Sequence, residues 1–179
     1  MKTSIKTFLK RPSKDNSNRS ANPSVTRAST ILFDTMKELK KHELRIKQNK
    51  KITHYSYGRY GSSTTIELEN ILKELENAYH VFLTGTGFGG IALALMSLCR
   101  PGDEILVSDN VYGPTKEISE KLLKEFNVTA KFYNPDSFED LKNKISKKTK
   151  MILVENPGSN TFEFQDLSKI VNLAKKKKI

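Results

Sequence analysis

Cysteine is almost absent from this sequence of 179 residues, in which Cys99 stands alone. A single cysteine excludes a disulfide within the chain and a cysteine-rich zinc site, and it fits a reducing compartment. Because Cys99 ends the apolar run IALALMSLC, we expect a buried structural thiol and not a nucleophile.

Long apolar runs are also missing. No run reaches the length of a transmembrane helix, and residues 1–20 contain no apolar signal core. We therefore expect a cytoplasmic protein without a membrane span.

The chain lacks the charge pattern of a nucleic-acid binder, although its net charge is +11. The lysines are mixed with acids on expected helix faces, and no arginine-rich stripe alternates with aromatic residues, so we expect no nucleic-acid partner. His42, His54 and His80 lie on different expected elements without metal-ligand spacing, so we expect no metal site.

The first part of the chain consists of a polar segment followed by two helical patterns. Residues 1–24 are rich in Ser, Asn, Lys and Pro, which predicts a loose arm, and residues 26–35 predict a short extended segment. The segment 36–51 predicts a charged helix, and 66–78 predicts an amphipathic helix capped by Thr64 or Thr65.

The second part alternates strand and helix patterns. Strands are expected at 80–84, 104–108, 129–133 and 151–155, and helices at 88–98, 114–126, 137–146 and from 167 onward. Such alternation predicts an α/β fold with a mostly parallel sheet covered on both faces. Three or four strands make an incomplete sheet of this kind, so we expect the chain to be one part of a larger fold.

A glycine motif, GTGFGG at residues 85–90, follows the first of these strands. It matches G-x-G-x-x-G, and Asp109 lies about twenty residues later, as in a dinucleotide-binding turn. Glycines at a helix start equally suit a single phosphate, because backbone N–H groups and the helix dipole favour an anion there. Close packing of helix on sheet is the third interpretation.

Three further loops carry candidate ligand-binding residues. The loop YSYGRYG, residues 55–61, places an arginine among tyrosines, a combination competent for phosphate. Tyr112 and the segment 156–159 each follow the carboxyl end of an expected strand. Since α/β sheets bind ligands at that edge, we expect the site there.

These motifs, in this order and spacing, resemble the N-terminal half of the pyridoxal-phosphate-dependent transsulfuration enzymes, the Cys/Met metabolism family. The resemblance runs from about Asn22 to Ile179 and implies the large domain of the aminotransferase-like fold type I, a three-layer sandwich. It implies an arm and helix at 1–50 and the start of the cofactor-binding domain at 51–179. The motif ENPGS favours the cystathionine β-lyase branch, whose β-elimination yields homocysteine, pyruvate and ammonia.

The resemblance assigns roles to individual residues. Gly87 and Phe88 match a pair whose backbone N–H groups hold the cofactor phosphate. Tyr57 and Arg59 match residues that reach that phosphate from a neighbouring subunit, which implies a homo-oligomer. Tyr112 matches the tyrosine that stacks on the pyridine ring and assists proton transfer.

Ser159 lies where relatives carry an asparagine that contacts substrate or cofactor. The Schiff-base lysine, the Asp against the pyridine nitrogen and the Arg for the substrate carboxylate lie, in the family, beyond the position of Ile179. Residues 146–150, SKKTK, resemble the Ser-x-Thr-Lys loop that carries the Schiff-base lysine in the family. Because they precede an expected strand in a charged turn, we expect a surface turn and not a catalytic lysine there. We therefore expect a truncated or split lyase for sulfur amino acids, inactive unless a C-terminal chain complements it.

Two alternatives remain open at this point. The first is a non-catalytic remnant or phosphate-binding module. The second is an NAD(P)-binding protein of the Rossmann type.

Overall fold

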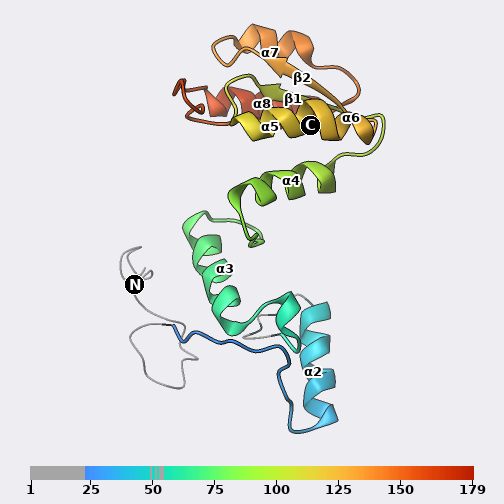
Figure 1. Cartoon of the computed structure of the whole chain (residues 1–179), viewed down its shortest axis with the longest axis vertical. Coiled ribbons are helices and arrows are strands. Elements are labelled where there is room, and N and C mark those ends of the chain that lie inside the picture. The colour runs from blue at the N-terminus through green and yellow to red at the C-terminus, as the bar shows by residue number, and fades with distance from the viewer. Residues whose placement is uncertain (1–22, 49, 51, 53–54) are drawn as a thin grey trace. The chain divides into compact units, whose positions relative to one another are not determined.

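The structure is a computed structural model that describes residues 23–48, 50, 52 and 55–179 (Figure 1). Most of the expected arm and His54 lie outside the described residues. The chain divides into two compact units, and the boundary in the sequence falls between Leu83 and Thr84. The expected boundary between residues 50 and 51 stays a prediction. Within the described ranges, no helix is long and apolar enough to cross a membrane.

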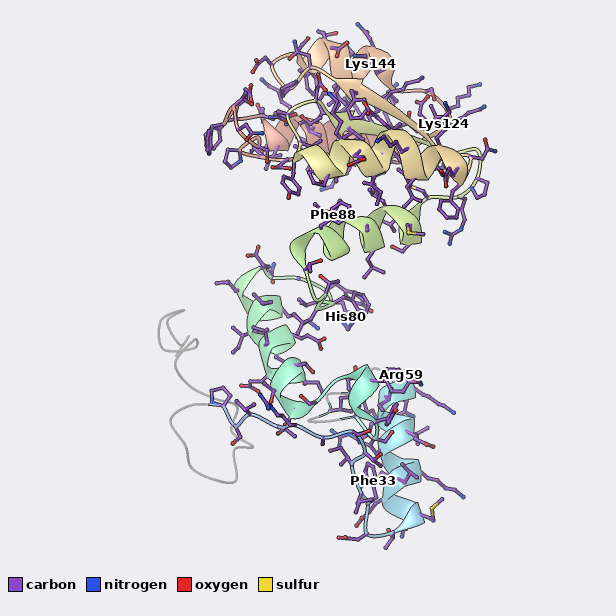
Figure 2. All side chains as sticks on the ribbon, viewed as in Figure 1. Phe33, Arg59, His80, Phe88, Lys124 and Lys144 are labelled. Atoms are coloured by element: carbon purple, nitrogen blue, oxygen red, sulfur yellow. The ribbon has the colours of Figure 1, made fainter. Side chains whose placement is uncertain are left out.

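The first unit contains two α-helices and a single 3₁₀ turn among its described residues. They are α2 (Met36–Lys47), η1 (Gly58–Tyr60) and α3 (Ser63–Leu75). The extended segment before α2 runs beside η1, where Thr30 and Tyr57 form an antiparallel bridge. The Phe33 ring packs against buried His42 of α2, with ring centroids 5.1 Å apart (Figure 2).

The cap of α3 differs from the prediction. Ser62 caps the helix, in place of Thr64 or Thr65, because Ser62 is still extended at φ −120° and ψ 176°. Its hydroxyl accepts from the Thr65 N–H at 3.5 Å, and the Thr65 hydroxyl accepts from the Ser62 N–H at 2.8 Å. Thr65 therefore completes a capping box, whereas the Thr64 hydroxyl accepts from the Thr26 N–H at 2.8 Å.

The second unit is built on a parallel sheet in the order β2-β1-β3. The strands are β1 (Glu104–Ser108), β2 (Thr129–Tyr133) and β3 (Thr149–Leu153). The helices are α4 (Gly87–Leu98), α5 (Gly113–Glu117), the π-helical η2 (Ile118–Leu122), α6 (Leu123–Glu125), α7 (Phe138–Lys144) and α8 (Leu167–Lys177). The predicted α/β class with a parallel sheet is confirmed.

One predicted strand is wrong. Residues 80–84 are irregular, and the Phe82 side chain is 75% exposed. A strand requires hydrogen bonds to a neighbouring strand, and none of the strand pairings among the described residues includes this segment. The apolar residues of 80–84 therefore predicted a strand, but the segment does not form one.

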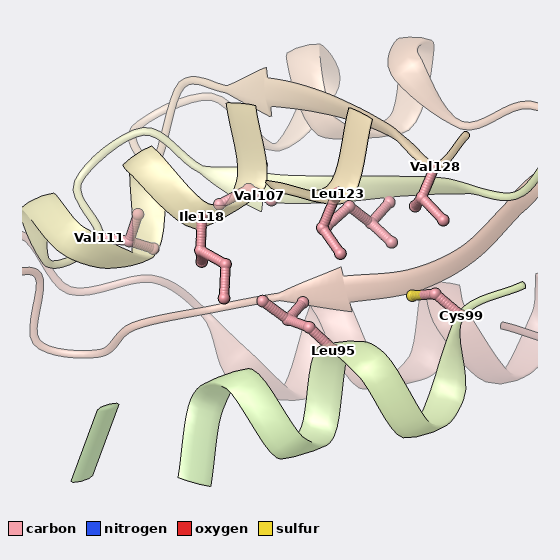
Figure 3. Close-up of a cluster of buried hydrophobic side chains, with 8 residues drawn as sticks. Leu95, Cys99, Val107, Val111, Ile118, Leu123 and Val128 are labelled. Carbon is pink, nitrogen blue, oxygen red and sulfur yellow. The ribbon is translucent and has the colours of Figure 1, made fainter. Parts of the chain in front are cut away.

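The sheet is covered on both faces, as its residue pattern dictates. In β1, Ile105 and Val107 point to one face, and Leu106 points to the other. The first face packs against α4 and the continuous helical segment α5–η2–α6, where Leu95, Ile118 and Leu123 join the cluster (Figure 3). The second face packs against Leu141 of α7 and Ile170 of α8, which makes three layers.

Cys99 is buried in the first of these clusters, as expected (Figure 3). Burial raises the pKa of its thiol, the nearby Asp103 carboxylate raises it further, and Arg100 offsets part of the change. Since the thiolate is the reactive form, this cysteine is a packing residue.

Glu104 is a buried carboxylate at the amino end of β1. It accepts hydrogen bonds from the Thr149 hydroxyl at 2.8 Å and the Ser146 hydroxyl at 2.9 Å, and it pairs with the Lys131 ammonium at 2.5 Å. Burial alone would raise the pKa of the Glu104 carboxyl, but these three partners outweigh it and lower the pKa. The carboxylate therefore joins all three strands.

We expect the Glu104→Gln substitution to lower the free energy of unfolding at neutral pH by about 1–3 kcal/mol, because it removes a charged acceptor from three donors. A carboxyl whose pKa is lowered on folding stabilises the protein above its unfolded pKa, and this stability is lost as pH falls. Urea unfolding of both proteins at several pH values checks this. The two stabilities should converge in acid, and a constant difference would contradict the assignment.

Candidate functional site

The first candidate feature is the start of α4. Thr86 caps this helix, and its hydroxyl accepts from the Gly89 N–H at 2.9 Å. The Thr84 hydroxyl donates to the Thr86 carbonyl at 2.8 Å and steadies the cap. The N–H groups of Gly87 and Phe88, the first two of the helix, have no carbonyl one turn earlier to accept them. The helix start therefore presents two donors and a positive dipole end to solvent.

The glycines of the motif serve two different purposes. A Cβ added to Gly85 or Gly87 would meet no atom within 4 Å, so packing does not require glycine at either position. At Gly89, by contrast, a Cβ would lie 3.0 Å from the Thr86 hydroxyl oxygen and disturb the cap. The contact that constrains Gly89 is therefore with the cap of its own helix and not with the sheet, whereas the open approach to Gly85 and Gly87 suits a ligand.

Tyr112 is the second feature, between β1 and α5. Its side chain is 48% exposed. Its backbone N–H donates to the Glu155 carboxylate at 2.9 Å, and its carbonyl accepts from the Thr115 N–H at 2.8 Å. The backbone of Tyr112 is therefore fixed by hydrogen bonds, and its ring is accessible at the carboxyl end of the sheet.

Ser159 is the third feature, and it meets the same carboxylate. The Ser159 hydroxyl donates to Glu155 at 2.6 Å, and its N–H donates to the Asn110 carbonyl at 2.9 Å. The hydroxyl proton is thus already engaged, and the oxygen retains its acceptor capacity. The structure brings Tyr112 and Ser159 together through Glu155.

The sequence analysis missed a polar network behind these residues. Asn110 is buried, and its side chain accepts from the Ser108 hydroxyl and donates to the Glu163 carboxylate at 3.3 Å. The Gln165 amide donates to the Ser108 hydroxyl at 3.0 Å and accepts from the Tyr133 hydroxyl at 2.8 Å. The polar strand end SDN was a local signal for Asn110, but no local pattern marks Gln165.

Tyr57 and Arg59 belong to the first unit, where side-chain contacts order their loop. The Arg59 guanidinium lies over the Tyr57 ring at 5.3 Å and the Tyr60 ring at 5.1 Å, and it donates to the Tyr60 hydroxyl at 3.2 Å (Figure 2). Gly58 is required between them, because a Cβ would lie 2.2 Å from the Ala28 carbonyl oxygen. Their predicted contact with a phosphate stays a prediction.

The sequence-predicted residues of the second unit share one side of the sheet. Tyr112 and Ser159 follow the carboxyl ends of β1 and β3, and α4 begins on the same side as α5 (Figure 1). The lysine-rich turn 146–150 lies at the opposite, amino end, where Ser146 bonds Glu104. This placement agrees with the expected surface turn.

Asp109, the candidate for a dinucleotide ribose, has another partner. Its carboxylate accepts from the Lys116 ammonium at 2.5 Å. That bond raises the pKa of Lys116, although the pair is partly exposed. A ribose would have to compete with this ion pair. In the part of the chain that is described, no three His, Cys, Asp or Glu side chains gather as metal ligands would.

The parallel sheet has a helix start with free N–H donors at the edge where its strands end. This arrangement is typical of α/β proteins that bind a phosphate-bearing ligand. The particular family follows from comparison with known sequences. The profile of the Cys/Met metabolism PLP-dependent enzymes matches residues 6–179. The chain belongs to this family, whose enzymes use pyridoxal phosphate (PLP).

Individual relatives agree with this assignment. The chain is 35% identical over 155 residues to a putative cystathionine β-lyase of Saccharomyces cerevisiae, covering 87% of this chain and 43% of the relative. It is 34% identical over 153 residues to the cystathionine β-lyase of Bordetella avium, covering 86% of this chain and 37% of the relative. The chain therefore spans about two fifths of the length of these relatives.

A solved structure confirms the fold. The putative O-acetylhomoserine (thiol)-lyase of Campylobacter jejuni superposes with a TM-score of 0.86 at 23% identity. The match covers 99% of this chain and 43% of that protein. The chain thus has the fold of one part of a fold type I enzyme, as the sequence predicted.

Proposed function

We propose that this chain is the phosphate-holding part of a cystathionine β-lyase-like enzyme, which releases homocysteine, pyruvate and ammonia by β-elimination at a carbon–sulfur bond. The observation that carries the proposal is the open start of α4 at the same edge of the sheet as Tyr112. The yeast and Bordetella relatives, named as cystathionine β-lyases, support the choice of reaction.

The residues of this edge fit PLP. The N–H groups of Gly87 and Phe88 would hold the phosphate, since the space around Gly87 is open. The Tyr112 ring would lie against the pyridine, and Ser159 would offer its oxygen to substrate or cofactor. When bound, PLP supplies an electron sink for a carbanion at the substrate's α-carbon. In an oligomer, Tyr57 and Arg59 of a neighbouring subunit would add a cation and a phenol at the phosphate.

The lysine that this chemistry requires is expected from another segment. Lys147, Lys148 and Lys150 lie at or beside the amino end of β3, away from the proposed site. Lys116 is engaged by Asp109. We therefore propose that the chain binds PLP without a covalent bond and gains activity only with a C-terminal segment that carries the lysine. The cytoplasmic location stays a prediction.

The test combines binding with complementation. Titration with PLP should give saturable binding that borohydride does not convert into a stoichiometric adduct on one lysine. Cystathionine cleavage should be absent from the chain alone and should appear when the C-terminal part of the yeast relative is added. Turnover by this chain alone would refute the proposed dependence on a second segment. Binding without turnover in every mixture would favour the non-catalytic phosphate-binding module.

A further inference from the structure

We propose that Glu155 is a positioning residue, whose carboxylate sets the direction of the Tyr112 ring and of the Ser159 hydroxyl at this edge of the sheet. The identity of the ligand rests on the proposed function, whereas the contacts that position Tyr112 do not.

Tyr112 is fixed by its backbone more than by its ring. Its N–H donates to Glu155 Oε2 at 2.9 Å, and its carbonyl accepts from the N–H groups of Thr115 at 2.8 Å and Lys116 at 3.2 Å. These bonds hold φ at −49° and ψ at 133°, which fixes the Cα–Cβ direction. Among the described residues, the Tyr112 hydroxyl has no hydrogen-bond partner, and nearly half of its side chain is exposed.

Glu155 joins two segments that are distant in sequence. Its second oxygen, Oε1, accepts from the Ser159 hydroxyl at 2.6 Å, and the Ser159 N–H donates to the Asn110 carbonyl at 2.9 Å. One carboxylate thus links the loop after β1 to the loop after β3. No other side chain among the described residues bonds to the Tyr112 N–H.

A carboxylate suits this position because both of its partners are donors. Glutamine can still accept from the Tyr112 N–H through its carbonyl oxygen, and its amide can donate to the Ser159 oxygen if that hydroxyl turns. Alanine removes both bonds and leaves the Tyr112 N–H without its charged acceptor. Glu155→Gln should therefore rescue what Glu155→Ala loses.

The experiment observes Tyr112 directly in the full chain. Tyrosines are replaced by 3-fluorotyrosine, and the Tyr112→Phe variant assigns the fluorine signal. Glu155→Ala should shift and broaden that signal and speed amide exchange at Tyr112 by about tenfold or more, because a charged hydrogen bond is lost. Glu155→Gln should resemble the wild type. The matched control is Glu139→Ala, which removes an exposed carboxylate that pairs with Lys142 on α7.

Ligand binding supplies the second readout. Glu155→Ala should weaken PLP binding by about tenfold and leave inorganic phosphate binding unchanged, because the N–H groups of α4 are untouched. Combined with Tyr112→Ala, it should add little, because both changes remove the same oriented ring.

Each outcome decides one of the two proposals. An unchanged fluorine signal and amide exchange in Glu155→Ala, with only a lower melting temperature, would overturn the positioning role. A wild-type chain that binds no PLP would overturn the proposed function, and the fluorine and exchange data would still decide the role of Glu155.

Discussion

Replacing Gly87 with proline is expected to leave α4 folded and to weaken PLP binding by about 10- to 100-fold. Proline is well tolerated at the first position of a helix, and the preceding Thr86 is extended at φ −148° and ψ 154°, as a residue before proline prefers. The Cβ of the ring also enters open space, since nothing lies within 4 Å of a Cβ at this position. What changes is one N–H donor, and a hydrogen bond to a charged group contributes about 1.5–3 kcal/mol.

Gly87→Ala is the matched control for this variant. It keeps the N–H and adds a methyl group to the same open space, so PLP affinity should stay within about threefold of the wild type. Equilibrium dialysis measures both affinities, and circular dichroism checks that the helix content is unchanged. Equal binding by the proline and alanine variants would show that the phosphate is not held at α4.

Gly158→Ala is expected to cause the largest loss of stability. An added Cβ would lie 2.1 Å from the Asn110 amide nitrogen and 2.9 Å from the Asn110 Cβ. Asn110 cannot move away without breaking its bonds to Ser108 and Glu163. Overpacking typically costs about 1–3 kcal/mol, and each broken hydrogen bond adds about 1 kcal/mol. We expect a loss of about 3 kcal/mol or more, measured by urea unfolding.

Two further variants test that explanation. Asn110→Gly in the Gly158→Ala background removes the clashing atoms and should restore part of the stability. Gly113→Ala is the control, because a Cβ at Gly113 meets nothing within 4 Å, and it should change stability by less than about 1 kcal/mol. If Gly158→Ala proves as mild as Gly113→Ala, the close packing against Asn110 does not constrain the loop.

The sequence was most informative where a local pattern and burial agreed. The runs that became β1 and β2 were predicted with their observed bounds, because segments of this length between turn signals suit a strand and are too short for a typical helix. The run at 80–84 has the same pattern, but a strand depends on a neighbour that periodicity does not reveal. Similarly, Ser62 and Thr65 both favour helix caps, and only the backbone conformation distinguishes the cap from its reciprocal partner.

The same difference between local patterns and contacts made by the fold applies to the candidate site. Tyr112 and Ser159 were predicted because loops after parallel strands meet at one edge. Glu155 and Gln165 were not, because their roles depend on which side chains the fold brings to them. Glu155 reaches Tyr112 across 43 positions, and Gln165 reaches Ser108 across 57. Spacing along the chain does not predict contacts over such distances in sequence.

The alternation along β1 has a consequence for how the second unit unfolds. Ile105 and Val107 belong to one cluster and Leu106 to the other, so three consecutive residues hold both helix layers. Inserting one residue into β1 would exchange the faces of all residues beyond it and damage both clusters at once. Neither helix layer can be lost independently while β1 keeps its register, and the layers should therefore melt in one cooperative transition.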